Sequence, residues 1–247
     1  MTRHAWMPAA GLSVATLVVA SSLAGCGTIG ISKEFSDSRT ETGPVSAISL
    51  TGGSSELAIT RSSSASEITI ERDVDYQHDK PDDRYDELDG DVLRLDGDCG
   101  DDCVIDYTVT VPDAVDVTVD VGSGDVLLVG LGDADIRTGS GDITVMRPTG
   151  SVGAAAGSGE ISITDADGPV TAETGSGDVE VELATANDVT ARASSGDLEL
   201  TVPAGSSYRV DADTRSGDET VTMPSDELGD HHLDVSTGSG DLSVTED

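Results

Sequence analysis

The chain has 247 residues and a net charge of -35, and its only lysines are Lys33 and Lys80. Such a surface repels nucleic acid backbones and anionic membranes, which argues against a nucleic-acid partner. Aromatic residues make up 2% of the chain, whereas small, β-branched and turn-forming residues are abundant. This composition favours strands and turns around a narrow core, in one elongated domain of about 200 residues.

The first 25 residues, MTRHAWMPAAGLSVATLVVASSLAG, have the pattern of a secretory signal, with an apolar stretch too short to span a membrane. The next residue completes Leu-Ala-Gly-Cys26, which is similar to a bacterial lipobox and implies acylation of Cys26 after cleavage. Two or more acyl chains anchor a protein stably. We therefore predict a signal peptide over 1–25, a lipid-anchored cysteine with a flexible tether over 26–44, and export to the outer face of the cell membrane.

Two acidic segments, at 78–91 and 96–103, are candidates for cation sites. Neither has the ligand spacing of an EF-hand loop, so solvated loops are the simpler interpretation. Cys99 and Cys103 lie in the second segment. Outside the cytoplasm a disulfide is the default for such a pair, and we predict a Cys99–Cys103 bond in a pinched loop.

A short motif, Gly-Ser-Gly-Asp with close variants, returns seven times in the second half of the chain. Its middle serines stand 17 to 23 residues apart: Ser123, Ser140, Ser158, Ser176, Ser195, Ser216 and Ser239. Apolar or small residues precede each serine at every second position, and after it the apolar positions shift by one. The glycine after each serine supplies the positive φ that a bend requires. The motif is therefore predicted to be a corner between two strands, with the serine pointing inward.

Stacked corners predict an all-β fold: a single β-solenoid or β-helix of about seven to eight coils over 45–247, with a degenerate first coil around Ser54. The alternative is an antiparallel β-meander or sandwich, in which each motif is a hairpin loop and Val121 faces Val126. We favour the solenoid because both halves of the pattern repeat as one unit. The last repeat is expected to form an exposed edge, protected by acids such as Glu219, in a monomeric protein.

The lipobox, the polar tether and the tandem Gly-Ser-Gly-Asp strands resemble a bacterial β-strand-repeat family labelled "putative adhesin". The resemblance covers roughly residues 45–247 and implies a β-solenoid domain of unknown function. It implies a structural, adhesive or binding module of the cell envelope, with the membrane and an envelope protein or glycan as partners. The motif is repetitive rather than catalytic, so the resemblance supports the fold more than any activity.

An acid follows the second glycine of every corner and is expected to point outward. These acids are Asp125, Asp142, Glu160, Asp178, Asp197, Asp218 and Asp241. Neighbouring carboxylates in such a column repel by about 1 kcal/mol in water, and each is expected to bond backbone N–H groups at its own corner. Weak binding of calcium along the column is the alternative, which makes an acidic calcium-binding surface protein the second interpretation. The spacing differs from the nine-residue period of calcium-loaded β-rolls.

Catalysis is poorly supported, and we predict that the protein is not an enzyme. No serine stands in a nucleophile elbow, and no Arg or Lys is marked as the base of a glycan-active β-helix enzyme, which is the third interpretation. The gaps between corners grow toward the C-terminus, and repeat proteins often place insertions on one binding face. We therefore expect Tyr208, Arg209, His231 and His232 to lie near one another as candidate binding residues. No cofactor other than calcium is implied.

Overall fold

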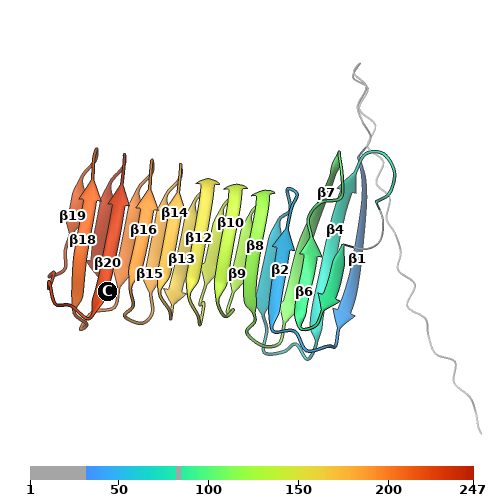
Figure 1. The fold of residues 1–247 in the computed structure, drawn as a ribbon, viewed down its shortest axis with the longest axis horizontal. Coiled ribbons are helices and arrows are strands. Elements are labelled where there is room, and N and C mark those ends of the chain that lie inside the picture. The colour runs from blue at the N-terminus through green and yellow to red at the C-terminus, as the bar shows by residue number, and fades with distance from the viewer. Residues whose placement is uncertain (1–31, 82–84) are drawn as a thin grey trace, which may run out of the picture. The chain divides into compact units, whose positions relative to one another are not determined.

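A computed structural model of the chain describes residues 32–81 and 85–247. The predicted signal peptide and Cys26 lie outside the described residues. The regular secondary structure of the described residues consists of β-strands alone. These strands form two sheets that enclose one apolar core (Figure 1). These residues form no helix that is long and apolar enough to cross a bilayer. The all-β class predicted from the sequence is confirmed.

Neighbouring strands in each sheet mostly come from neighbouring repeats. In the described residues the first sheet has eleven strands, in the spatial order β1 (Lys33–Glu41), β4 (Ile68–Tyr76), β7 (Cys103–Val111), β3 (Leu57–Arg61), β9 (Val126–Val129), β11 (Ile143–Met146), β13 (Ile161–Ala166), β15 (Val179–Leu183), β17 (Leu198–Val202), β21 (Leu242–Glu246) and β19 (Glu219–Val221). The second sheet has ten, in the order β18 (Tyr208–Thr214), β20 (His231–Thr237), β16 (Val189–Ala193), β14 (Val170–Thr174), β12 (Val152–Ser158), β10 (Ala134–Ser140), β8 (Asp116–Ser123), β2 (Ala47–Thr51), β6 (Val92–Asp96) and β5 (Asp86–Asp89).

The repeated middle consists of parallel strands paired in register. β8 pairs with β10 and β9 pairs with β11, so the two strands that flank one corner belong to different sheets. Equivalent apolar residues stack, with Ile143 beside Val126 on one side and Ile161 on the other. The corner is therefore no hairpin loop, and the antiparallel meander is wrong for this region. Antiparallel pairs among the described residues are β1–β4, β4–β7 and β5–β6, all at the N-terminal end.

Inward and outward residues alternate along the strands as predicted. In β10, Ala134, Ile136 and Thr138 are buried, whereas Asp135 and Arg137 are exposed. This period of two directs one face of each strand toward the core and the other toward solvent. The inward residues are mostly Val, Ile, Leu and Ala, and the large aromatic side chains Tyr107 and Tyr208, each 1% exposed, are buried toward the two ends of the chain's repeats.

Each corner turns at the glycine that follows the serine. Gly177 has a φ of 137°, and a Cβ atom there would lie 2.1 Å from the carbonyl oxygen of Gly159 in the neighbouring repeat. The serines, however, do not point into the core: Ser123 is half-buried and the other six are exposed. The prediction of inward-facing serines is wrong because the last inward residue, such as Thr174, already completes the core. The chain then leaves the sheet, and the serine lies on the outside of the corner.

The order of repeats in space differs from the order in sequence at the C-terminal end. β20 and β21, from the last repeat, lie between the β16–β17 repeat and the β18–β19 repeat. The edge is therefore formed by β18 and β19, and the prediction that the final repeat forms the edge is wrong. Glu219 on β19 is in register with the buried Leu242 but is itself exposed. The connections at 203–207 and 222–230 provide the length needed to pass over one repeat.

The N-terminal end is reordered in the same way. β2 and β3 lie between β6–β7 and β8–β9, and β1 pairs with β4 along its whole length. Residues 33–41 thus form an edge strand, and the prediction of a flexible tether is wrong for them. Their strand pattern is hard to recognise because Phe35 is the only apolar residue among them. The other residues that alternate with it on the same face are charged: Lys33, Asp37, Arg39 and Glu41.

Candidate ligand-binding site

The corner acids form a hydrogen-bonded ladder along the stack. Asp125 Oδ1 accepts the backbone N–H of Asp142 (2.9 Å), and Asp142 Oδ1 accepts that of Glu160 (2.9 Å). The same bond runs from Asp197 N–H to Asp178 (2.8 Å), from Asp241 N–H to Asp197 (2.8 Å) and from Asp218 N–H to Asp241 (2.9 Å). Each of these aspartates therefore bonds the neighbouring repeat rather than its own corner.

This ladder gives the acidic column a structural use. One oxygen of each bonded aspartate already accepts a hydrogen bond from the neighbouring repeat, so these aspartates have a structural role that needs no metal ion. No group of three or more His, Cys, Asp or Glu side chains that could hold a metal occurs within residues 32–81 and 85–247. Calcium binding along the column stays a prediction, and we base no site on it.

The predicted disulfide is present and closes the loop between β6 and β7. Cys99 and Cys103 are joined, with their Cα atoms 5.6 Å apart. The acids beside them cap their own loop: Asp96 Oδ1 accepts the N–H of Asp98 (2.9 Å), and Asp98 Oδ1 accepts the N–H of Gly100 (3.0 Å). Such side chain to backbone bonds are typical of tight turns and do not assemble a cation site.

The four residues proposed as a binding group lie together on β18 and β20. Tyr208 is in register with His231, and Arg209 with His232. The rings of Tyr208 and His231 have centroids 5.8 Å apart, but Tyr208 is 1% exposed and its hydroxyl donates to the carbonyl of Pro203 (3.1 Å). Tyr208 therefore packs in the core and cannot meet a ligand.

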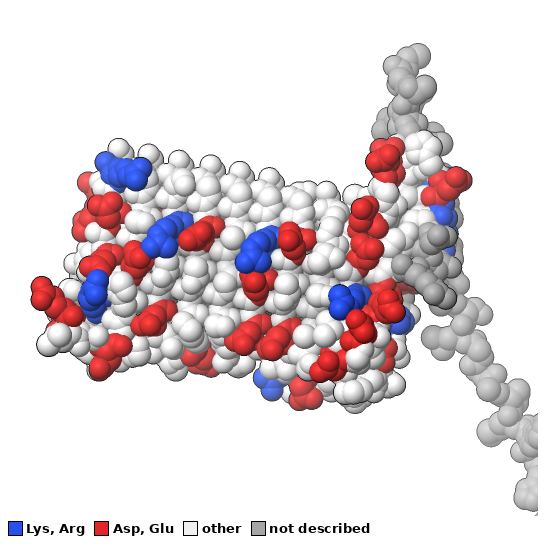
Figure 2. All heavy atoms as spheres, viewed as in Figure 1, with Lys and Arg blue, Asp and Glu red and all other residues white. Residues whose placement is uncertain are grey.

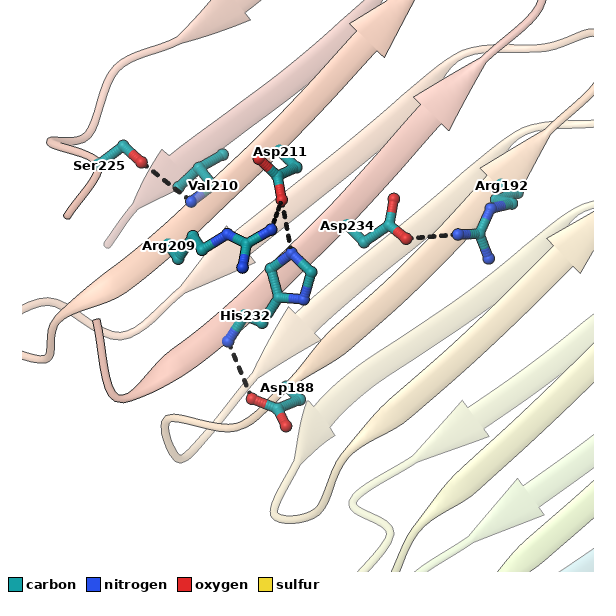
Figure 3. A network of polar contacts seen from close by, with 8 residues as sticks. All are labelled: Asp188, Arg192, Arg209, Val210, Asp211, Ser225, His232 and Asp234. Atoms are coloured by element: carbon teal, nitrogen blue, oxygen red, sulfur yellow. Dashed lines mark hydrogen bonds and ion pairs between the residues drawn. The ribbon is translucent and has the colours of Figure 1, made fainter. Parts of the chain in front are cut away.

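The polar members of this group are held by acids (Figure 3). His232 Nε2 lies 2.8 Å from Asp211 Oδ2, and Arg209 Nη2 donates to the same oxygen (2.6 Å). These two hydrogen bonds, from His232 first and Arg209 second, lower the pKa of Asp211. The network joins the edge strand β18 to β20, which accounts for these side chains without a ligand. Figure 2 likewise shows basic side chains lying beside acidic ones across this face.

The N-terminal end holds an arrangement of a different kind, centred on an arginine in a core position. The inward face of β4 carries Ile68, Ile70, Arg72 and Val74, and all four residues are buried. The side chain of Arg72 is 6% exposed. Burying a guanidinium is costly unless it is paired and hydrogen-bonded, so its partners decide whether it is tolerated.

Arg72 is paired on one side only. Its Nε donates to Asp37 Oδ1 (2.9 Å) and its Nη2 to Asp37 Oδ2, and this bidentate contact raises the pKa of Arg72. The guanidinium carbon lies 5.4 Å from the ring centroid of Tyr85 and 5.9 Å from that of Phe35. The remaining nitrogen, Nη1, is buried and has no hydrogen-bond partner among the described residues. Both N–H donors of Nη1 are thus left without an oxygen acceptor.

A second ion pair joins the two sheets at this end. Arg39 of β1 contacts Asp86 of β5, whose side chain is 9% exposed. Burial raises the pKa of Asp86, although Arg39 and Arg72 both act to lower it. Beneath them, the hydroxyl of Tyr107 donates to the carbonyls of Tyr85 and Asp96, both at 2.8 Å. Burial also raises the pKa of the Tyr107 hydroxyl, so it remains a donor.

The two ion pairs, Arg72–Asp37 and Arg39–Asp86, line an open cleft of about 820 Å³ between β1 and β4 of one sheet and β5 and β6 of the other. The volume lies in the usual range for small-molecule sites. The sequence did not predict the cleft, although Asp86, Glu87 and Asp96 fall in the two acidic segments considered as cation candidates. One signal was available: Arg72 interrupts the apolar alternation Ile68, Ile70, Val74, and a charged residue at an inward position often marks a functional site.

The family is identified by a match that covers most of the chain. Residues 28–246 match the family described as Toastrack DUF4097, and the chain belongs to it. This confirms the resemblance to a domain of unknown function inferred from the repeats. Among curated proteins, none matches the chain significantly.

Solved structures with low identity also resemble the chain. A "putative adhesin" from Bacteroides fragilis NCTC 9343 is 13% identical, with a TM-score of 0.40 over 87% of this chain and 97% of that one. A "putative adhesin" from Parabacteroides distasonis ATCC 8503 is 11% identical, with a TM-score of 0.41 over 88% and 98%. A "putative cell adhesion protein" from Clostridium sporogenes ATCC 15579 is 8% identical, with a TM-score of 0.35 over 87% and 100%. At TM-scores below 0.5 these likenesses say nothing about what the chain binds.

Proposed function

We propose that the protein is an exported lipoprotein that acts as a binding module of the bacterial cell envelope, with the N-terminal cleft as its ligand site. The lipobox at Cys26 supports the anchor, and the Cys99–Cys103 bond is consistent with an oxidising compartment. The stacked strand pairs are interpreted as the coils of a β-solenoid. Seven coils carry the repeated corner, and the β2–β3 and β6–β7 pairs extend the stack.

The observation that carries the binding role is the burial of Arg72. In the same strand Ile68, Ile70 and Val74 fill equivalent inward positions with apolar side chains. A buried ion pair is weak evidence for stability, because an apolar residue of similar size often serves as well or better. A charged side chain kept at such a position, beside a cleft and a carboxylate of raised pKa, supports a ligand site.

The anchor is tested by fractionation of cells that produce the protein. We expect Cys26→Ala to move the protein from the membrane fraction to the soluble exported fraction, because the acyl chains supply the membrane affinity. The matched control is the double variant Cys99→Ala and Cys103→Ala, which removes two cysteines and leaves the lipobox intact. Membrane retention of Cys26→Ala equal to that of this control would contradict the lipoprotein assignment.

The binding role is tested by recovery of envelope components on the immobilised protein. Wild type and Arg137→Gln should retain the same components, because Arg137 lies on the outer face of β10 and pairs with Asp135. Arg39→Gln should lose them, because it removes a charged donor from the cleft while leaving Arg72 in place. Equal recovery by all three proteins would exclude the cleft as the ligand site.

A further inference from the structure

We infer that the ligand of the N-terminal cleft is an uncharged saccharide. This inference rests on the proposed function, because it names the chemical class bound at the same site. Ten of the fourteen residues that line the cleft are polar or charged, so the walls are unsuited to a purely apolar molecule. The class of ligand is decided by which hydrogen-bonding groups these walls present and how they are already paired.

Donors and acceptors are interleaved in the cleft. Its three guanidiniums belong to Arg39, Arg72 and Arg94, and its five carboxylates exceed them by two. Guanidiniums only donate hydrogen bonds and carboxylates only accept them. A phosphate, which mainly accepts, would face five carboxylates in a chain of net charge -35. An ammonium group, which only donates, could bond the carboxylates but would offer no acceptor to the three guanidiniums. A phosphate therefore meets net repulsion, and an ammonium leaves the donors of the cleft unmatched.

The charges of the cleft also compensate one another locally. Arg72 pairs with Asp37, Arg39 pairs with Asp86, and Arg94 pairs with Asp89 beside the cleft. Hydrogen-bonding capacity remains on the outer members, because the side chains of Asp37 and Arg39 are 48% and 43% exposed. A hydroxyl both donates and accepts, so adjacent hydroxyls can bond an arginine and its carboxylate together. Saccharides present such hydroxyls in rows.

An apolar surface completes the match. Leu88, which is half-buried, lines the cleft beside Tyr85, whereas Ile70 and Leu95 also border it but are each 2% exposed and contribute little surface. Tyr85 is 9% exposed and held in place, since its carbonyl accepts from Tyr107 and its ring lies against Arg72. The C–H face of a sugar ring is apolar and packs on aromatic and aliphatic side chains, while its hydroxyl edge reaches the ion pairs.

The test measures binding to the purified full chain by saturation-transfer NMR and calorimetry. The probes are maltotriose, cellotriose and chitotriose as neutral saccharides, inorganic phosphate as an anion, spermidine as a cation and trialanine amide as a peptide. We expect saturable binding of at least one trisaccharide and none of the other three probes. Arg39→Gln and Arg94→Gln should each weaken it about tenfold or more, because each removes a charged hydrogen-bond donor. Arg137→Gln should change it less than twofold.

Circular dichroism of every variant shows whether it is folded, and Arg94→Gln guards against misfolding of Arg39→Gln because Arg94 is well exposed. If phosphate, spermidine or the peptide binds, and the cleft variants weaken that binding, the saccharide inference is overturned while the cleft remains the binding site. Saccharide binding that the cleft variants leave unchanged would overturn the inference, as would the absence of binding by all three trisaccharides. The proposed function itself fails only if the cleft variants also recover envelope components as wild type does.

Discussion

The repeated middle of the stack and its N-terminal end differ in how neighbouring strands and corners pack against one another. In the middle, backbone N–H groups donate to carbonyls of the neighbouring repeat, as in the bond from Val126 N–H to the carbonyl of Asp142 (2.9 Å). The corners approach so closely that only glycine fits at positions such as Gly177. At the N-terminal end the equivalent of that glycine is Ser55, which is fully buried.

This difference shows where chemical variety is permitted. A repeat in the middle is constrained on both sides by copies of itself, so its inward residues stay small and apolar. At the N-terminal end the translational partner is missing, and antiparallel strands close the sheet instead. Arg72 and Asp86 on these strands, and Tyr85 just before β5, have no counterparts in the middle. The end of a repeat stack is therefore the region in which a unique site can be built.

The largest expected effect is at the corner glycines. Gly177→Ala should lower the free energy of unfolding by about 3 kcal/mol or more, because the new Cβ meets the Gly159 carbonyl oxygen at 2.1 Å at positive φ. Gly205→Ala is the matched control: its φ is 90° and no atom lies within 4 Å of the new Cβ. It should cost about 1–2 kcal/mol from φ alone. Urea unfolding measures both, and equal losses would show that close stacking does not require the glycine.

At the N-terminal end, the buried hydroxyl of Tyr107 should matter next. Tyr107→Phe should cost about 1–3 kcal/mol, because the carbonyls of Tyr85 and Asp96 lose their shared donor. Tyr76→Phe serves as control, since the half-buried Tyr76 hydroxyl has no hydrogen bond among the described residues, and should change stability by less than about 0.5 kcal/mol. Thermal unfolding distinguishes them. A Tyr107→Phe protein as stable as the control would mean that this end is not held by its hydroxyl.

The aspartate ladder of the middle predicts a smaller effect. Asp178→Ala should cost about 1 kcal/mol because the N–H of Asp197 loses its acceptor, and Asp178→Asn should cost less because an amide oxygen still accepts. Glu160→Ala should stay within about 0.5 kcal/mol, since the Glu160 carboxylate has no hydrogen-bond partner among the described residues. The comparison is made by urea unfolding at neutral pH. Equal free energies of unfolding for Asp178→Ala and Glu160→Ala would show that the aspartate ladder does not stabilise the fold.

The smallest expected effects are opposite pH dependences in the two regions. Hydrogen bonds from Ser151 lower the pKa of Asp133 below its ordinary 3.8, so its stabilisation is present above that value and is lost as pH falls through the folded pKa. Burial raises the pKa of Asp86, so its contribution is present below 3.8 and is lost as pH rises through the folded pKa.

Urea unfolding between about pH 3 and 6 tests both signs, because the other titrating groups cancel in a difference from wild type. The deficit of Asp133→Asn should shrink toward the acid end of the range. The stability of Asp86→Asn relative to wild type should increase as the pH rises toward about 6. Parallel pH profiles for wild type and Asp86→Asn would show that burial does not perturb this carboxyl.

Much of the fold was predictable because it depends on patterns formed by residues close together in the sequence. The alternation of inward residues such as Val126 and Leu128 depends on side-chain parity along the strand. The bend at each corner depends on its glycine. Both features are specified by residues close together in the sequence. The family likeness follows from the same repeats. The inward-facing serines were predicted wrongly, because parity along the strand does not reveal where the opposite sheet ends.

The candidate site was not predicted, since its parts lie far apart in the chain. Asp37, Arg72 and Asp86 come from three strands, and all three lie antiparallel to their neighbours outside the repeat pattern. β1 in particular has one apolar residue, so its pairing with β4 depends on the partner rather than on its own sequence. Only Arg72, set among apolar inward residues, gave a local sign of the site.

The sequence by itself determined the unit of this protein: two strands, a glycine corner and an outward acid, each set by interactions within a few residues. Tertiary structure alone decided the order in which the units stack. β20 and β21 fit between two earlier repeats, and β2 and β3 between two later ones, because any unit can pair with any other in parallel register when its loops are long enough. It also decided how the N-terminal end is closed. There a missing neighbour must be replaced by distant strands, and no local pattern specifies which strands those are.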